Sequence, residues 1–259
     1  MDANEVLTYL SSLYEEAKPR FLSLSPKAIK RKSANDILTD ADLAMNEFFV
    51  SRLSSRYPEA RLIAEESENP ELGEGWTFVV DPLDGTCNYA LGLPLCGIQI
   101  ALFHDQDPVA SLIGLPLLDE LYLAAKGAGA TRNGNPLRLD SCVKAKDGIL
   151  ALSDFYEDGD LPLAKQYEAV ASLRSKFLKT RLFGASCFDF ACLASSKAQA
   201  YFCQYHCLWD VAPGYLLCLE AGAVSCGLGG KPYRFGDHTL LLANSPENLA
   251  LLREAAKAA

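Results

Sequence analysis

Apolar side chains recur with helical spacing at the beginning of this 259-residue chain. Residues 6–17 place them on one face, and Pro19 is expected to end that helix. A polar stretch at 30–36 predicts a loop. A second helix is expected after Thr39 and Asp40, because both residue types commonly cap helix N-termini.

Short apolar runs with strand-like spacing follow, separated by turn-like polar stretches. They cover residues 61–64, 77–80, 97–103, 109–115 and 121–125. An antiparallel sheet is the natural prediction, with a tight turn at 127–136 before residues 137–139.

Beyond about residue 145 the pattern alternates between strands and helices. Strands are predicted at 148–152, 181–183, 200–203, 223–226 and 239–243, and helices at 161–177, 188–195, 211–220 and 246–256. The predicted fold class is therefore α/β, with an α+β half over residues 1–145 and an α/β half over 146–259. Because no stretch rich in Pro, Gly or Ser separates them, the halves are expected to form one compact unit.

Composition narrows the classes of protein to consider. A formal net charge of −9 disfavours binding to nucleic acid or to anionic membranes. No apolar stretch is long enough to span a bilayer, and the acidic N-terminus does not resemble a signal peptide. The nine cysteines are scattered and mostly lie in apolar runs, which is typical of reduced thiols in a cytoplasmic protein. A zinc site at Cys203, His206 and Cys207 is an alternative without an evident fourth ligand.

The sequence DPLDGTCN at residues 81–88 combines backbone-bending residues with acids. Pro82 cannot donate to a sheet and Gly85 permits a sharp turn, so the strand is expected to end at Asp81. Asp81 and Asp84 would then share a short turn. With the carbonyl of Leu83 and the hydroxyl of Thr86, it offers hard oxygen ligands that suit Mg²⁺. The alternative is an ordinary Asp-Gly turn.

Other acids have local explanations when they are taken singly. Glu65 and Glu66 follow a predicted strand, where solvated charge is common. Asp42 falls in the first turn of a helix, which favours a carboxylate, and Asp210 precedes a helix that it could cap.

Together these segments resemble the inositol monophosphatase family. The resemblance rests on 65–67 (EES), 81–88 (DPLDGTCN) and 209–214 (WDVAPG), on Lys32, Ser33, Asp36, Thr39 and Asp42, and on 127–130, 132–134 and 184–186. It implies a layered αβαβα fold and a Mg²⁺-dependent, lithium-sensitive phosphomonoesterase that forms a homodimer.

The resemblance also implies the metal ligands. Glu65, Asp81 and the carbonyl of Leu83 would hold one Mg²⁺, and Asp81, Asp84 and Asp210 a second, with a third, weaker ion near Glu65. Electrostatics supports such a grouping, because clustered carboxylates in a cleft repel one another unless cations neutralise them.

The implied catalysis is direct attack by a metal-activated water, without a phosphorylated enzyme. Glu65 and Thr86 would position and deprotonate the water, with Asp42 hydrogen-bonded to Thr86. Backbone N–H groups of Gly85 and Thr86 would bind the phosphate.

The predicted substrate contacts are Ala185, Ser186 and Cys203. Cys203 stands where relatives that act on inositol phosphates have a carboxylate, and a thiol is a poor partner for a diol. Gln204, Tyr205 or His206 could substitute, so we expect a broad or non-inositol preference. Fructose 1,6-bisphosphate, nucleotide 3′-phosphates, NADP and histidinol phosphate are the alternatives. A regulatory protein of the same fold that binds the transcription machinery is a further hypothesis.

Overall fold

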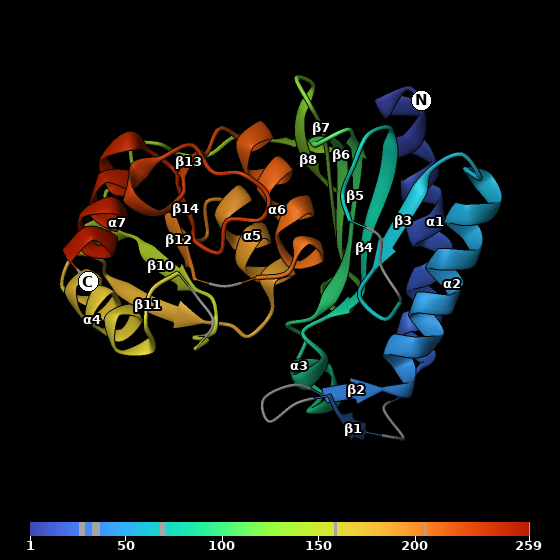
Figure 1. Cartoon of the computed structure of the whole chain (residues 1–259), viewed down its shortest axis with the longest axis horizontal. Coiled ribbons are helices and arrows are strands. Elements are labelled where there is room, and N and C mark those ends of the chain that lie inside the picture. The colour runs from blue at the N-terminus through green and yellow to red at the C-terminus, as the bar shows by residue number, and fades with distance from the viewer. Residues whose placement is uncertain (26–28, 33–36, 68–70, 158–159, 205, 259) are drawn as a thin grey trace.

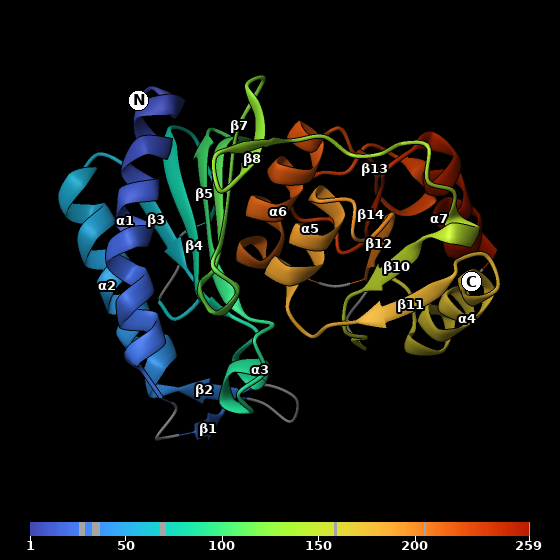
Figure 2. The ribbon, with the colours of Figure 1, turned by 180° about the vertical axis from the view of Figure 1, so that it is seen from behind.

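The computed structural model describes residues 1–25, 29–32, 37–67, 71–157, 160–204 and 206–258. Their helices and strands stack in five alternating layers (Figures 1 and 2). The helical layers are the pair α1 (Ala3–Ser23) and α2 (Asp40–Arg56), the central pair α5 (Ser186–Ala194) and α6 (Leu208–Ala221), and the outer pair α4 (Leu163–Arg174) and α7 (Pro246–Ala258). One sheet lies on each side of the central pair, so the predicted αβαβα layering is confirmed.

The larger sheet has seven strands in the order β3-β4-β5-β6-β7-β8-β9. Their bounds are β3 Arg61–Ala64, β4 Trp76–Asp84, β5 Gly97–His104, β6 Asp107–Leu115, β7 Glu120–Ala125, β8 Gly129–Arg132 and β9 Asn135–Leu137. All neighbours pair antiparallel except β3 and β4, which are parallel. The predicted antiparallel sheet is confirmed.

The smaller sheet has five strands in the order β11-β10-β12-β14-β13. They are β10 Ile149–Leu152, β11 Lys179–Leu182, β12 Ala200–Cys203, β13 Val224–Cys226 and β14 Leu240–Ala243. Strand β10 is parallel to both of its neighbours, whereas β14 is antiparallel to β12 and β13.

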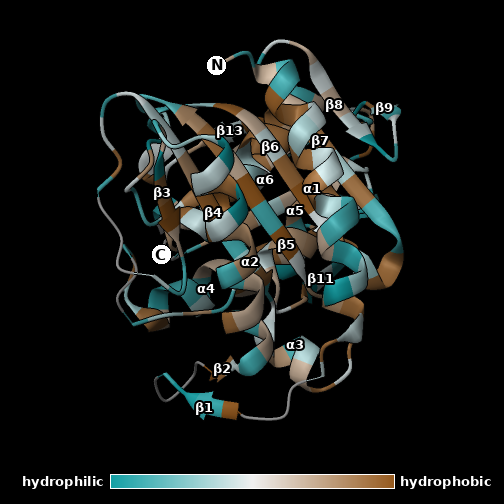
Figure 3. Cartoon of the chain, turned by 90° about the vertical axis from the view of Figure 1, so that its right-hand side faces the viewer, coloured by the Kyte–Doolittle hydropathy of each residue, from teal (hydrophilic) through white to brown (hydrophobic). Residues whose placement is uncertain are grey.

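Short elements complete the described chain. Strands β1 (Ile29–Arg31) and β2 (Ile37–Thr39) form a hairpin, and α3 (Thr86–Ala90) packs beside β2 below the large sheet (Figures 1 and 3). Single 3₁₀ turns occur at Pro116–Leu118, Ala145–Asp147 and Leu228–Gly230. Within the described residues, no helix combines the length and the apolar composition that a bilayer span requires.

Both faces of the large sheet are covered by apolar helix surfaces. Strands β5 and β6 are buried along almost their whole length and are largely hydrophobic (Figure 3); on this face α1 packs against β6 and β7, and α2 against β3 and β4. On the opposite face, α6 packs against β4 to β7. Helix α6 is therefore held between the two sheets, which fixes the start of the helix against the end of β4.

Four local predictions were wrong at their boundaries. Helix α1 continues through Pro19 because that residue is exposed and the apolar face extends to the buried Phe21. Strand β4 continues past Asp81 to Asp84. The predicted loop at 30–36 contains part of β1, and the predicted turn at 127–136 contains β8.

The contact between the two central helices depends on Gly214. A Cβ atom at this position would lie 2.0 to 2.6 Å from ring atoms of Phe190 in α5. Helix propensity favours Ala over Gly by about 1 kcal/mol, but overpacking of a rigid core costs about 1–3 kcal/mol. At 2.0 Å from an aromatic ring the steric effect exceeds the gain in propensity.

We therefore predict that Gly214→Ala lowers the free energy of unfolding by about 1–3 kcal/mol in urea titrations. Gly227→Ala is the control, because a Cβ there would meet nothing closer than 3.5 Å. It should change stability by less than about 0.5 kcal/mol. Stabilisation by Gly214→Ala would contradict the packing argument.

Candidate active site

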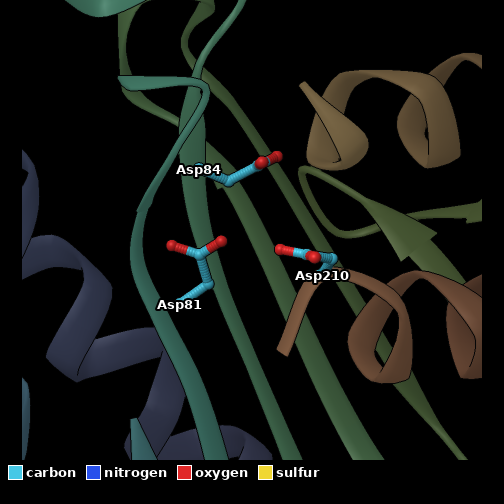
Figure 4. A group of neighbouring side chains, drawn as sticks. All are labelled: Asp81, Asp84 and Asp210. Carbon is cyan, nitrogen blue, oxygen red and sulfur yellow. The ribbon is translucent and has the colours of Figure 1, made fainter. Parts of the chain in front are cut away.

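Three carboxylates from two distant segments converge in a cleft of about 1020 Å³. Asp81 and Asp84 come from the end of β4, and Asp210 comes from the first turn of α6 (Figure 4). One oxygen from each lies within 4.8 Å of the others. Glu65 and the backbone of Leu83 line the same cleft, so the structure brings the predicted metal-ligand set together.

A bulge in β4 places Asp81 and Asp84 on the same side. Along β4 the residues advance from Asp81 to Asp84, while their partners on β5 advance only from Gln99 to Gly97. Side chains three residues apart in a regular strand point to opposite faces, and one extra residue restores a common face. Pro82 suits the bulge because it has no N–H to leave unpaired.

Gly85 joins the bulge to α3 with a left-handed backbone, at φ 81°. A Cβ there would lie 2.8 Å from Cβ of Ala185 and 2.9 Å from the carbonyl oxygen of Leu95. Asn88 fastens the same junction by donating hydrogen bonds of 2.8 Å to the carbonyls of Leu95 and Phe183. The sharp turn predicted at Gly85 is confirmed, and it holds the two halves of the cleft together.

Backbone donors from the central helices orient two of the acids. Asp84 accepts a hydrogen bond from the N–H of Cys187 (2.5 Å), and the hydroxyl oxygen of Ser186 lies 3.2 Å from the same carboxylate oxygen, so Asp84 caps α5 from another segment. Asp210 accepts from the N–H of Cys207 at 2.8 Å in a capping box. The N-cap of α6 is Cys207, three residues before Asp210. Asp210 is therefore not the N-cap that the sequence suggested, but lies in the first turn of the helix.

Gln99 is a site residue that sequence reasoning missed. Its amide donates to the hydroxyl of Ser186 (2.6 Å) and to the carbonyl of Asp210 (3.2 Å), and Ser186 also donates to that carbonyl (2.8 Å). This network ties β5, α5 and α6 together beside the acids. The available signal was one amide in the otherwise apolar run at 97–103.

Asp42 serves a helix cap and the site at once. One oxygen accepts from the backbone N–H of Thr39 (2.7 Å) and from its hydroxyl. The other oxygen accepts from the hydroxyl of Thr86 at 2.8 Å, so the predicted hydrogen bond is present. The Thr86 hydroxyl also lies 3.3 Å from the carbonyl oxygen of Leu83. The Thr86 hydroxyl has a single proton, which it donates to Asp42. Its oxygen lone pairs therefore remain able to accept a hydrogen bond from a ligand.

Burial dominates the electrostatics of the acids. It raises the pKa of Glu65 to about 7 against the opposing charge of Lys32, and it raises the pKa of Asp81 and Asp84. The negative charges of Glu65, Asp84 and Asp210 raise the pKa of Asp81 further. An all-oxygen set of mutually repelling buried acids fits a hard divalent cation.

Lys32 provides the positive charge that faces these acids. Its ammonium group lies 2.9 Å from Glu65 and also pairs with Glu66. Burial lowers the pKa of Lys32, but the hydrogen bonds and charges of the two glutamates outweigh burial and raise it. Ser33 and Asp36 of the same motif lie outside the described residues.

The cleft also holds the predicted substrate contacts. Ala185, Ser186 and Cys203 all line it, and Cys203 is 1% exposed. Burial raises the pKa of the Cys203 thiol to about 12, which keeps it neutral. Six of the nine cysteines are buried, as predicted. Tyr205 lies outside the described residues.

His206 lines the same cleft and is held in its neutral form. Its Nε2 lies 3.2 Å from the hydroxyl of Tyr233. Burial lowers the pKa of His206 to about 4, and the nearby His238 lowers it further. The unfolded chain, with a pKa near 6.5, binds more protons between about pH 4 and 6.5, so the folded state loses stability as the pH falls through this window.

We predict that His206→Gln removes about 1–2 kcal/mol of the loss in unfolding free energy that wild type shows between pH 7 and pH 5. Urea titrations at both pH values measure it. His104→Gln, at an exposed histidine outside the cleft, is the control and should change this loss by less than His206→Gln does. Equal pH profiles for His206→Gln and wild type would contradict the prediction.

Comparisons with known proteins agree with this geometry. A model of the inositol monophosphatase family matches residues 5–259. An inositol monophosphatase of Dictyostelium discoideum is 30% identical over 76% of this chain and 74% of its own length. The Nus factor SuhB of Xylella fastidiosa is 32% identical over 77% of this chain and 72% of its own. The crystal structure of the extragenic suppressor protein SuhB from Bartonella henselae aligns with a TM-score of 0.83 at 26% identity, covering 93% of each chain.

Proposed function

This chain belongs to the inositol monophosphatase family and is a phosphomonoesterase, and we propose that it hydrolyses small phosphate esters with Mg²⁺ bound by its buried acids. The observation that carries the proposal is the convergence of Asp81, Asp84 and Asp210 within 4.8 Å, next to the hydrogen-bonded pair Thr86 and Asp42. A hard cation is the partner that such an oxygen cluster suits best.

We assign the metal ligands as two overlapping sets. Glu65, Asp81 and the carbonyl of Leu83 would hold one ion, Asp81, Asp84 and Asp210 a second, and a third would lie near Glu65. Bound Mg²⁺ would neutralise the phosphate, activate water and stabilise the leaving oxygen. The hydrogen bonds that Asp84 and Asp210 accept from the starts of α5 and α6 would fix the orientation of their carboxylates.

The chain's own groups would complete the reaction. The Thr86 hydroxyl donates its proton to Asp42, so it can accept a hydrogen bond from the attacking water, and Glu65 would take the proton. Backbone N–H groups of Gly85 and Thr86 stand at the start of α3, where intrahelical partners are lacking, and would bind phosphate oxygens. Attack would be direct, without a covalent phosphoenzyme.

We predict that Thr86→Val lowers kcat by about 10²–10⁴-fold, because a residue of the same shape can no longer accept the water's hydrogen bond. Mn²⁺ binding, followed by electron paramagnetic resonance, should stay within threefold of wild type. Thr86→Ser keeps the hydroxyl and should recover most of kcat. Loss of metal binding in Thr86→Val would show instead that Thr86 supports the ligands.

The reaction is tested by phosphate release from a panel of esters with and without Mg²⁺. The panel is inositol 1-phosphate, fructose 1,6-bisphosphate, a nucleotide 3′-phosphate, NADP and histidinol phosphate. We expect Mg²⁺-dependent hydrolysis of at least one ester, inhibition by Li⁺, and loss of activity in Asp84→Asn. No Mg²⁺-dependent release from any of them would sink the proposal.

A regulatory function is the second candidate, because a relative at 32% identity is named as a Nus factor. The complete acidic cluster favours catalysis over a purely binding role. In a purely regulatory protein, Asp84→Asn would leave the cellular function intact. We also propose a homodimer, a cytoplasmic location and a boundary between the halves at residue 145.

A further inference from the structure

Asp189 is a buried acid that neither the metal set nor the helix caps use. It is the one charged residue of α5, whose sequence is SCFDFACLA, and it is 1% exposed. The side chain nevertheless lines the active-site cleft. Among the described residues, its Oδ1 has no hydrogen-bond partner.

Local structure within the described residues gives Oδ1 of this acid no hydrogen-bond partner. Asp84 caps α5 by accepting from Cys187, and the backbone N–H of Asp189 already bonds to the carbonyl of Ala185 at 3.1 Å. The first turn of α5 favours the charge of Asp189 through the helix dipole, but it gives Oδ1 no hydrogen bond, and an unpaired buried carboxyl oxygen is unfavourable. A ligand hydroxyl in the adjoining cleft would supply the missing hydrogen bond.

Asp189 lies near both Asp84 of the acidic cluster and Cys203, because its charge interacts with each of them. It is two residues after Cys187, about 3 Å further along the axis of α5 from a group that binds Asp84. Helical side chains tilt toward the helix N-terminus, which here faces Asp84. Burial, followed by the charges of Asp84 and Asp154, raises the pKa of Asp189, and the charge of Asp189 acts in turn on Cys203.

We propose that Asp189 recognises a hydroxyl group of the leaving alcohol, on a carbon next to the one that carries the phosphate. The proposal rests on the phosphomonoesterase function and names its substrate class, the phosphates of polyols and sugars. A carboxyl from α5 thereby replaces a contact that the neutral thiol of Cys203 on β12 cannot make. The hydrolysed bond is unchanged, and Asp189 contributes to binding and selectivity.

The test compares two ring esters that differ by one hydroxyl, cis-2-hydroxycyclohexyl phosphate and cyclohexyl phosphate. Wild type should favour the hydroxylated ester by about tenfold or more in kcat/KM. Asp189→Leu should reduce this ratio to below about threefold, by losing activity on the hydroxylated ester alone. Asp189→Asn keeps a donor and an acceptor in the same shape and should retain part of the preference.

Asp147→Asn is the control, because Asp147 is an exposed carboxyl outside the cleft, and it should leave the ratio unchanged. Equal losses of Asp189→Leu on both esters would overturn the proposal and assign Asp189 a structural role. A wild-type preference below threefold, or hydrolysis of neither ring ester, would overturn it even if Asp189→Leu does not fold. Failure of the parent function is a separate result, namely no phosphate release from any ester of the panel.

Discussion

Repulsion among clustered carboxylates, of which Asp81 and Asp84 are buried and Asp210 is half-buried, is the constraint on which the rest of this structure depends. Oxygens of Asp81, Asp84 and Asp210 lie within 4.8 Å of one another. At an effective dielectric constant of about 20, each ionised pair at that separation costs about 3 kcal/mol. Hydrogen bonds from the starts of α5 and α6 offset part of this cost, and a divalent cation would offset more. Metal binding at this site would therefore be coupled to stability.

The groups that stabilise the acids come from different layers of the fold. Asp84 belongs to the large sheet but caps α5, and the amide of Gln99 reaches from β5 to the carbonyl of Asp210. The cluster is complete only when both central helices are packed against the large sheet. Gly85 and Gly214 allow that close approach, because a Cβ at either position would overlap a neighbouring element. The close packing at the centre of the molecule is therefore also what brings the residues of the site into position.

Apolar periodicity predicted most helices and strands well, because most of them bury one continuous apolar face, whereas the αβαβα layering followed from the family resemblance. It failed where one residue changes the geometry. The bulge between Asp81 and Asp84 is a register effect that depends on the partner strand, so β4 looked as if it ended at Asp81. Convergence of Asp210 with β4 followed from the family resemblance and not from spacing. Gln99 and Asp189 were both visible as lone polar residues in apolar segments, but only their surroundings in the fold give those positions meaning.

The same acid can cap a helix and remain available to bind a ligand. Asp42 caps α2 through one oxygen and accepts from Thr86 through the other, and Asp210 uses one oxygen in the capping box of α6 while its side chain faces Asp81 and Asp84. A carboxylate has about four acceptor sites, so a cap occupies only part of its capacity. The cap also restricts the rotamer, which lowers the entropy that a ligand must remove on binding. An acid that caps a helix is thus expected to be a well-oriented metal ligand where other acids lie within reach.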